Sequence, residues 1–346
     1  MFVWHRMNSS EPVGAASGTQ KVYESTQPID GLAEDATNGE IAFVGSALSG
    51  DLWDGSFGVL HVGDKEDAAA TLKMVAGLPS GTSSVRWLTS DILVLGNDEG
   101  LVSVVRVTAE GLMESLCDEC LHDDMVASVD ANKERSIVAS GSYDGTVKLW
   151  NADDVQSGRM PLRACFTQAD ECHGVAWTGT DMVTAVYADG MLCLYDPRAN
   201  ACVVRVKCGD LALTAVAASA EPAWSVVAVG DDSGVVQLWD LTKMGDSKPV
   251  YTCKPHSWAC TALALHVGGD GRLMIASGGE DRRVVVHAVE RTTPEDGMDQ
   301  QQLKVTEVYT DRSHKDAVNA LLWQKKGDHP VLLSASRDKT ILQHRL

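Results

Sequence analysis

Short apolar runs recur along the chain at a nearly constant interval. Each run ends in a small residue, passes through a turn rich in Asp and returns as alternating apolar residues, as in IVASGSYDGTVKLWN at 137–151. This alternation around an Asp-Gly tip is typical of a tight β-hairpin, because Asp and Gly accept the positive backbone φ of such turns. Seven copies are present, and their turns are predicted at Gly55, Gly100, Gly145, Gly190, Gly234, Arg282 and Lys339, with steps of 45, 45, 45, 44, 48 and 57 residues.

Two further strands are predicted for each copy. A small, apolar run precedes six of the hairpins, as in SSVRWL and HGVAW, and stretches such as MESLCDE and CVVRVKC follow them. Four strands at this period indicate the blades of a propeller. The predicted fold is therefore all-β, a seven-bladed β-propeller over residues 18–346, with an exposed loop insertion at 292–302 in the longest step.

The ring must be closed by a strand from outside the last copy. The chain ends with TILQHRL, the third strand of the seventh blade. We expect QKVYES (20–25), which precedes the first blade, to supply the fourth strand, because a closed ring leaves no open sheet edge. Residues 1–17 are polar and small, and we expect them to be disordered.

A set of His, Ser, Asp and Trp residues recurs at equivalent places. The set resembles the tetrad of WD repeats, in which a buried indole and an imidazole find hydrogen-bond partners. Because the set recurs around the ring, a structural role is favoured over a catalytic one. Its predicted members are His122, Ser140, Asp144 and Trp150 in blade three, His256, Ser277 and Asp281 in blade six, and His314, Ser334 and Asp338 in blade seven.

Composition limits the class of partner and the compartment. The formal charge is −19, which disfavours direct binding of nucleic acid and attracts basic proteins, unless the acidic turns serve only solubility. Nine dispersed Cys indicate reduced thiols, the N-terminus lacks a signal peptide, and no apolar run approaches the ~18 residues of a membrane helix. We expect a cytoplasmic and nuclear protein.

No motif for enzyme chemistry was found. The sequence has no phosphate-cradling Gly loop and no nucleophile elbow. Cys117 and Cys120 form one CxxC with His122 close behind, but a zinc site would need a second pair of ligands, so ordinary thiols are favoured. We therefore predict no catalytic residue, no metal and no cofactor.

Blade one carries an unusual Trp. Trp53 lies near the tip of the predicted hairpin, where it either projects as an anchor for a partner or folds back on a neighbouring loop. The stretch SALSGDLWDGS (46–56) resembles the blade-one signature of the methylosome protein 50 family, also called WD repeat-containing protein 77. HDDMV (122–126) and HKDAV (314–318) resemble the family's entries to its third and last blades.

This resemblance implies a function. Members of the family are partners of the type II protein arginine methyltransferase, which makes symmetric dimethylarginine. It implies that Trp53 inserts into the methyltransferase's N-terminal TIM-barrel domain, with Leu52, Asp51 and Asp54 around it. The complex then methylates basic Arg/Gly-rich tails of Sm proteins and histones, which suits an acidic propeller.

A second stretch of the sequence indicates an alternative function. The stretch YDPR, with Asp196 and Arg198, is a near match to the Trp-Asp-x-Arg box through which many WD propellers bind cullin-type ubiquitin ligases as substrate receptors. The same residues also suit the ordinary end of a WD strand.

Overall fold

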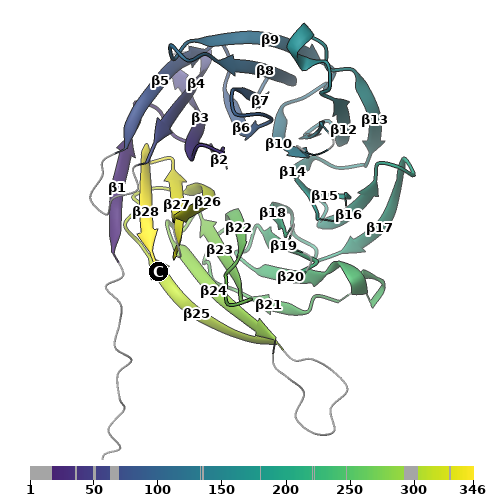
Figure 1. Ribbon diagram of the computed structural model, residues 1–346. Helices are drawn as coiled ribbons and strands as arrows, with labels where there is room; N and C mark the ends of the chain where they lie inside the picture. Colours follow the sequence, from purple (N-terminus) through teal and green to yellow (C-terminus); the bar gives the residue numbers. More distant parts are fainter. Residues whose placement is uncertain are drawn as a thin grey trace, which may run out of the picture.

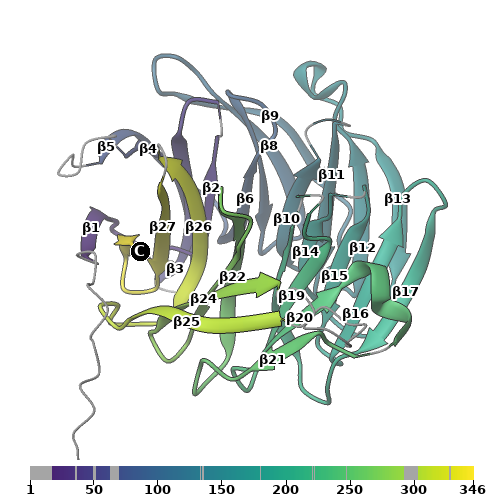
Figure 2. The same cartoon turned by 60° about the horizontal axis from the view of Figure 1, so that its bottom comes forward.

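Seven four-stranded antiparallel sheets form a ring in this computed structural model (Figure 1, and tilted in Figure 2). The all-β, seven-bladed prediction is thus confirmed. The segments expected to be disordered (1–17) and to form an exposed loop (292–302) lie outside the described residues. The structure describes residues 18–35, 37–49, 52–62, 70–132, 134, 136–179, 181–219, 221, 223–246, 248–291, 303–326 and 329–346.

Each blade orders its strands from the central channel outward. Blades one to four contain β2 (Gly31–Glu34), β3 (Glu40–Ser49), β4 (Leu52–His61) and β5 (Thr71–Leu78); β6 (Thr82–Trp87), β7 (Ile92–Asn97), β8 (Leu101–Val107) and β9 (Met113–Cys120); β10 (Val126–Asn132), β11 (Ile137–Ser142), β12 (Thr146–Asn151) and β13 (Leu162–Thr167); β14 (Cys172–Trp177), β15 (Val183–Tyr187), β16 (Met191–Asp196) and β17 (Ala201–Lys207).

Blades five to seven follow the same plan. They contain β18 (Leu213–Ala218), β19 (Val226–Asp231), β20 (Val236–Asp240) and β21 (Tyr251–Cys253); β22 (Cys260–Val267), β23 (Leu273–Gly279), β24 (Val284–Arg291) and β25 (Leu303–Asp311); β26 (Val318–Lys326), β27 (His329–Ser336), β28 (Thr340–Arg345) and β1 (Thr19–Glu24). The short 3-10 segments η2 (Val155–Ser157) and η3 (Leu241–Asp246) lie in connections.

The first strand of the chain closes the ring. β1 pairs antiparallel with β28, from Thr19 opposite His344 to Glu24 opposite Thr340 (Figure 1). The segment predicted to close the last blade therefore does so, and the two ends of the propeller share one sheet. The apolar core lies between blades, where for example Val94 of blade two and Trp150 of blade three are fully buried in one cluster.

A belt of hydrogen bonds joins the innermost strands. In blades two to seven each inner strand has a β-bulge, at which the pairing with the second strand skips one residue. The side chains of five of these six residues donate to a backbone carbonyl of the next blade. The bonds run from Ser83 Oγ to Val126 O (2.6 Å), His173 Nδ1 to Leu213 O (2.9 Å), Thr214 Oγ1 to Cys260 O (2.7 Å), Thr261 Oγ1 to Val318 O (2.5 Å) and Asn319 Nδ2 to Ile29 O (3.4 Å).

The recurrent tetrad joins strands within a blade. In blade three the indole Nε1 of Trp150 donates to Ser140 Oγ at 2.8 Å, and His122 contacts Ser140 through Nε2 (2.8 Å) and Asp144 through Nδ1 (3.0 Å). The other two predicted sets make equivalent contacts: His256 with Asp281 (2.9 Å) and Ser277 (2.9 Å), and His314 with Asp338 (3.0 Å) and Ser334 (2.7 Å).

In blade seven a second histidine takes the place of the Trp. His344 Nε2 lies 2.6 Å from Ser334 Oγ, and its Nδ1 lies 3.0 Å from the hydroxyl of Tyr309 in blade six. Thr19 of the closing strand contacts the same hydroxyl at 2.8 Å and donates to Asp311 at 2.7 Å. One polar network therefore links the closing strand to the last two blades.

The sixth bulge residue is Ala127, whose side chain has no hydrogen-bond donor. Substitutions at the bulge positions therefore test how much the belt contributes to stability. Ala127→Ser should supply a hydroxyl for the carbonyl of Cys172 and raise the free energy of unfolding by about 0.5–1.5 kcal/mol. Thr261→Val should lower it by about 1–3 kcal/mol, because Val318 O loses its partner. Urea unfolding of both variants measures these free energies. An unchanged unfolding midpoint for Ala127→Ser would contradict the stabilising role of the hydrogen bonds between inner strands.

The network around His344 should make stability depend on pH. Burial lowers the pKa of His344 to about 4 from 6.5, so between these values the unfolded chain binds a proton that the folded chain does not. Stability therefore falls as the pH drops from 6.5, by about 3 kcal/mol for this group at most. His344→Gln should make the plot of unfolding free energy against pH shallower between pH 6.5 and 4.5; equal slopes would refute this.

Candidate functional site

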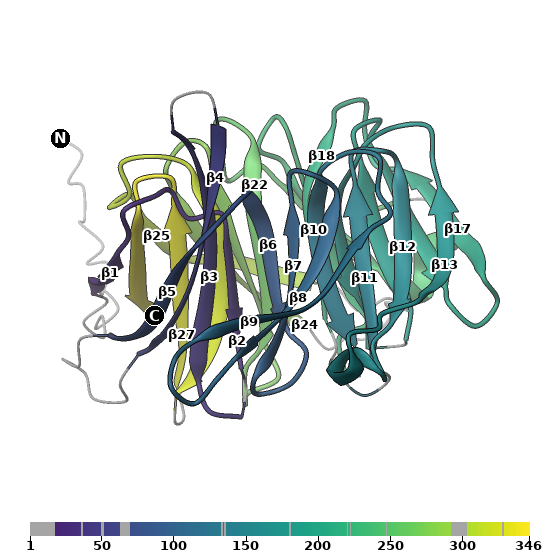
Figure 3. The same ribbon diagram turned by 90° about the horizontal axis from the view of Figure 1, so that it is seen from above.

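The β3–β4 hairpin of blade one is longer than its counterparts. Its two strands stay paired through Ser46–Gly55, Ala47–Asp54, Leu48–Trp53 and Ser49–Leu52 (Figure 3). In the other six blades the second and third strands are joined by three or four residues. We call residues 46–55 the blade-one extension.

The prediction of a turn at Gly55 was wrong. Gly55 lies inside β4, and a Cβ there would stand 2.0 Å from the carbonyl oxygen of Ser80, in the loop before the next inner strand. The turn residues Gly100 and Gly234 meet the equivalent loops, where a Cβ would stand 2.6 Å from His122 O and 2.4 Å from Trp258 O. Gly55 thus marks the level at which other blades turn back, and blade one continues for three pairs beyond the Ser46–Gly55 pair.

The predicted partner-binding residues all lie on the blade-one extension. The register places Trp53 opposite Leu48 and Asp54 opposite Ala47. The exposed fraction of Leu48 is 58%. Asp54 is half-buried. Asp51 and the side chains of Leu52 and Trp53 lie outside the described residues.

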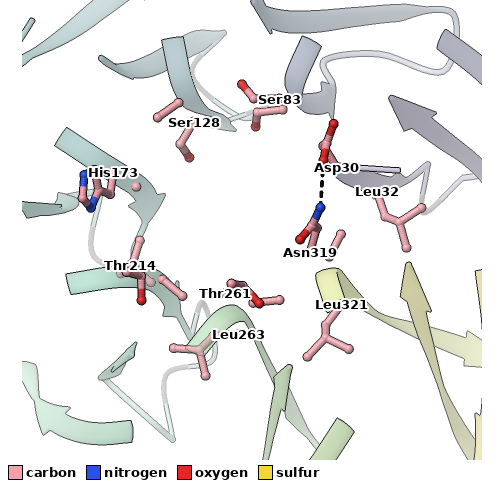
Figure 4. Close-up of a pocket in the computed structure, with 18 of the residues that line it drawn as sticks. Asp30, Leu32, Ser83, Ser128, His173, Thr214, Thr261, Leu263, Asn319 and Leu321 are labelled. Atoms are coloured by element: carbon pink, nitrogen blue, oxygen red, sulfur yellow. Dashed lines mark hydrogen bonds between the residues drawn. The ribbon is translucent and has the colours of Figure 1, made fainter. Parts of the chain in front are cut away.

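Asp30 holds the base of the extension. Its Oδ2 accepts the backbone N–H of Ser46 at 2.9 Å and the Ser46 hydroxyl at 2.7 Å. Its Oδ1 accepts a hydrogen bond from Asn319 Nδ2 at 2.8 Å, which is drawn in Figure 4. Burial raises the pKa of Asp30, although these hydrogen bonds favour the carboxylate. Asp30 could not be recognised from the sequence, because Pro28-Ile29-Asp30 has the composition of an ordinary turn.

The central channel offers polar groups that are already used. Asp30, Ser83, His173, Thr214, Thr261 and Asn319 line a cavity of about 150 Å³ (Figure 4). Except for Asp30, these are donors of the belt between blades. Within the described ranges, no three His, Cys, Asp or Glu residues are grouped to hold a metal ion. Cys117 is buried, while the Cys120 side chain lies outside the described residues.

The second predicted site lies at the other end of a blade. Asp196 ends β16, away from the hairpin turns, and its carboxylate binds Arg198 through Nε (3.1 Å) and Nη2 (3.2 Å). Arg198 is exposed, but its guanidinium is already paired. Tyr195, in place of the usual Trp, is buried and shares a 2.7 Å hydrogen bond with the Tyr187 hydroxyl.

Comparison with known sequences identifies the repeats. A profile of the family described as "WD domain, G-beta repeat" matches residues 118–151, 247–287 and 305–344, the segments that hold the three tetrads. No described helix is long and apolar enough to cross a membrane.

Known proteins resemble the chain to different extents. "Methylosome protein WDR77" of Xenopus laevis is 26% identical over 316 residues, which cover 89% of this chain and 87% of that protein. "Ribosome biogenesis protein WDR12 homolog" of Arabidopsis thaliana is also 26% identical, but over only 45% of this chain and 40% of that protein. A chain of the "Crystal Structure of Mitotic Checkpoint Complex" matches 100% of this chain, and 98% of its own length, with a TM-score of 0.70 at 15% identity, which shows the fold alone.

The match to the Xenopus protein confirms the resemblance first seen at residues 46–56 and extends it over most of the chain. Together with the seven sheets and the matched repeats, it shows that the chain is a seven-bladed WD-repeat β-propeller similar to a methylosome protein.

Proposed function

We propose that the protein is a non-catalytic scaffold that binds a type II protein arginine methyltransferase. The blade-one extension makes this contact, with Trp53 as the anchor, Leu52 beside it, and Asp51 and Asp54 at its margin. The bound enzyme then receives basic Arg/Gly-rich substrates, such as Sm proteins and histones, for symmetric dimethylation. We also propose a cytoplasmic and nuclear location, which suits nine cysteines dispersed along the sequence without the spacing of a disulfide framework.

The observation that carries the proposal is the blade-one extension itself. The segment with the most specific resemblance to the methylosome protein 50 family is also where blade one departs from the six other blades. The backbone of residues 46–49 and 52–55 is already paired and is held at its base by Asp30, so docking costs little backbone entropy in these two strands. Large aromatic side chains supply much of the binding energy at such interfaces.

The charge of the chain supports the presentation of substrates. A formal charge of −19 attracts Arg-rich tails and speeds their encounter with the scaffold. Holding a tail close to the bound enzyme raises its effective concentration at the active site. The ligase-receptor alternative is less favoured, because Asp196 already occupies the guanidinium of Arg198 that would have to bind an adaptor.

The proposal predicts that Trp53→Ala abolishes capture of the methyltransferase. Loss of a central aromatic anchor should weaken binding by about 2–4 kcal/mol, which is a factor of about 30 to 1,000 in Kd. The measurement is co-purification with the tagged protein from its own cells, followed by titration of the purified methyltransferase.

A matched control separates the anchor from a general loss of apolar surface. Trp258 is an exposed tryptophan in blade six, outside the blade-one extension. Trp258→Ala should therefore keep the wild-type affinity for the methyltransferase. The proposal fails if Trp53→Ala binds as tightly as the wild type, or if the wild-type protein captures no arginine methyltransferase.

A further inference from the structure

Trp258 projects from the face that also carries the hairpin turns. It lies in the loop before β22, and its exposed fraction is 61%. The turn of blade five reaches the same loop, since a Cβ on Gly234 would lie 2.4 Å from Trp258 O. Leu211, exposed by 47%, flanks the other side of this turn, where the N–H of Asp232 donates to Ala212 O at 3.0 Å. Trp258 and Leu211 thus border one hairpin turn.

The backbone holds Trp258 outward. On one side the N–H of Ser257 donates to Asp281 Oδ2 at 3.0 Å, and His256 before it belongs to the blade-six tetrad. On the other side Ala259 O accepts the N–H of Glu280 at 3.0 Å. Because the backbone on both sides of Trp258 is already fixed, binding of a ligand to the indole costs little backbone entropy.

The surroundings of Trp258 are acidic. The two loops (208–212 and 256–259) and the two turns (231–235 and 279–283) contain five carboxylates, two arginines (Arg282 and Arg283) and the buried His256. The guanidinium of Arg283 is already engaged, because its Nη1 donates to Pro255 O at 2.8 Å. Asp232 and Glu280 are exposed, and neither forms an ion pair within the part of the chain that the structure describes. The carboxylates in these four segments belong to Asp210, Asp231, Asp232, Glu280 and Asp281.

We propose that the surface formed by Trp258, Leu211, Asp232 and Glu280 is the docking site for an arginine of the basic substrate tail. A guanidinium stacks on an indole face by cation–π attraction, and nearby carboxylates strengthen its binding and speed encounter. Arginines separated by glycine fit best, because glycine lets the peptide backbone lie close to the flanking turns.

This inference rests on the proposed function and adds to it the place where the substrate binds. Gly234 lies beside Trp258, and Gly55 lies at the base of the blade-one extension. A Cβ on either glycine would contact the loop that precedes the next inner strand, so the two sites lie on one face of the propeller. Blade seven separates blade six from blade one in the ring (Figure 1). A tail held at Trp258 therefore remains on the side of the propeller where the enzyme docks.

The test is binding of a fluorescently labelled peptide of Arg-Gly repeats to the full-length protein, followed by anisotropy. Trp258→Ala should raise Kd at least about 10-fold, and Trp258→Phe should raise it less because a smaller aromatic face remains. Asp232→Asn with Glu280→Gln should weaken binding and flatten its salt dependence. Trp53→Ala should bind the peptide as the wild type does.

The outcomes separate this inference from the proposed function. If Trp258→Ala binds the peptide with wild-type Kd, the proposed docking site is wrong. Capture of the methyltransferase through Trp53 is tested separately, by the titration of the Trp53→Ala variant. If the wild-type protein does not bind the peptide, both the docking site and direct substrate presentation are overturned. Urea unfolding of each variant checks its fold, and Leu211→Ser gives a second, independent loss of the same surface.

Discussion

Every functional feature of this molecule depends on closure of the ring. A propeller blade buries its faces only against its two neighbours, so one unlinked pair of blades would expose both of their cores. Two devices prevent this. The bulged residues of the inner strands bond to the next blade around the channel, and β1 completes the outer edge of blade seven beside β28. Asp30 and Asn319 join the last blade to the first at the inner edge.

The same constraint positions the candidate partner site. Asp30 accepts one hydrogen bond from blade seven and two from Ser46, so the ring and the base of the blade-one extension share one carboxylate. In a repeat protein, a local departure from the shared pattern is where a specific function is expected. Blade one departs by three additional strand pairs, and blade six places Trp258 where blades three and seven have Asp124 and Asp316.

Much of the fold followed from the sequence because it is encoded locally and repeated. The period of the hairpins predicted seven blades, and the missing last strand pointed to the segment that forms β1. The tetrad residues were found from their spacing, and the structure brings each set together. The inner strand of blade one, Gly31–Glu34, was not found, because four residues carry too little alternation to recognise.

The site was harder to predict, since it depends on contacts between blades. Gly55 fits the repeat period, so it was assigned to a turn, but its small size instead permits close approach of Ser80 O. The belt of bonds between inner strands, the role of Asp30 and the exposure of Trp258 are tertiary facts that no spacing reveals.

The central claim is that the blade-one extension is the element that holds the methyltransferase. A cryo-electron microscopy structure of the two proteins together tests it most directly. The account predicts residues 46–55 buried against the enzyme, with the Trp53 side chain inside a pocket of the enzyme's N-terminal domain. An enzyme bound elsewhere on the propeller, with this hairpin left free in solvent, would contradict it.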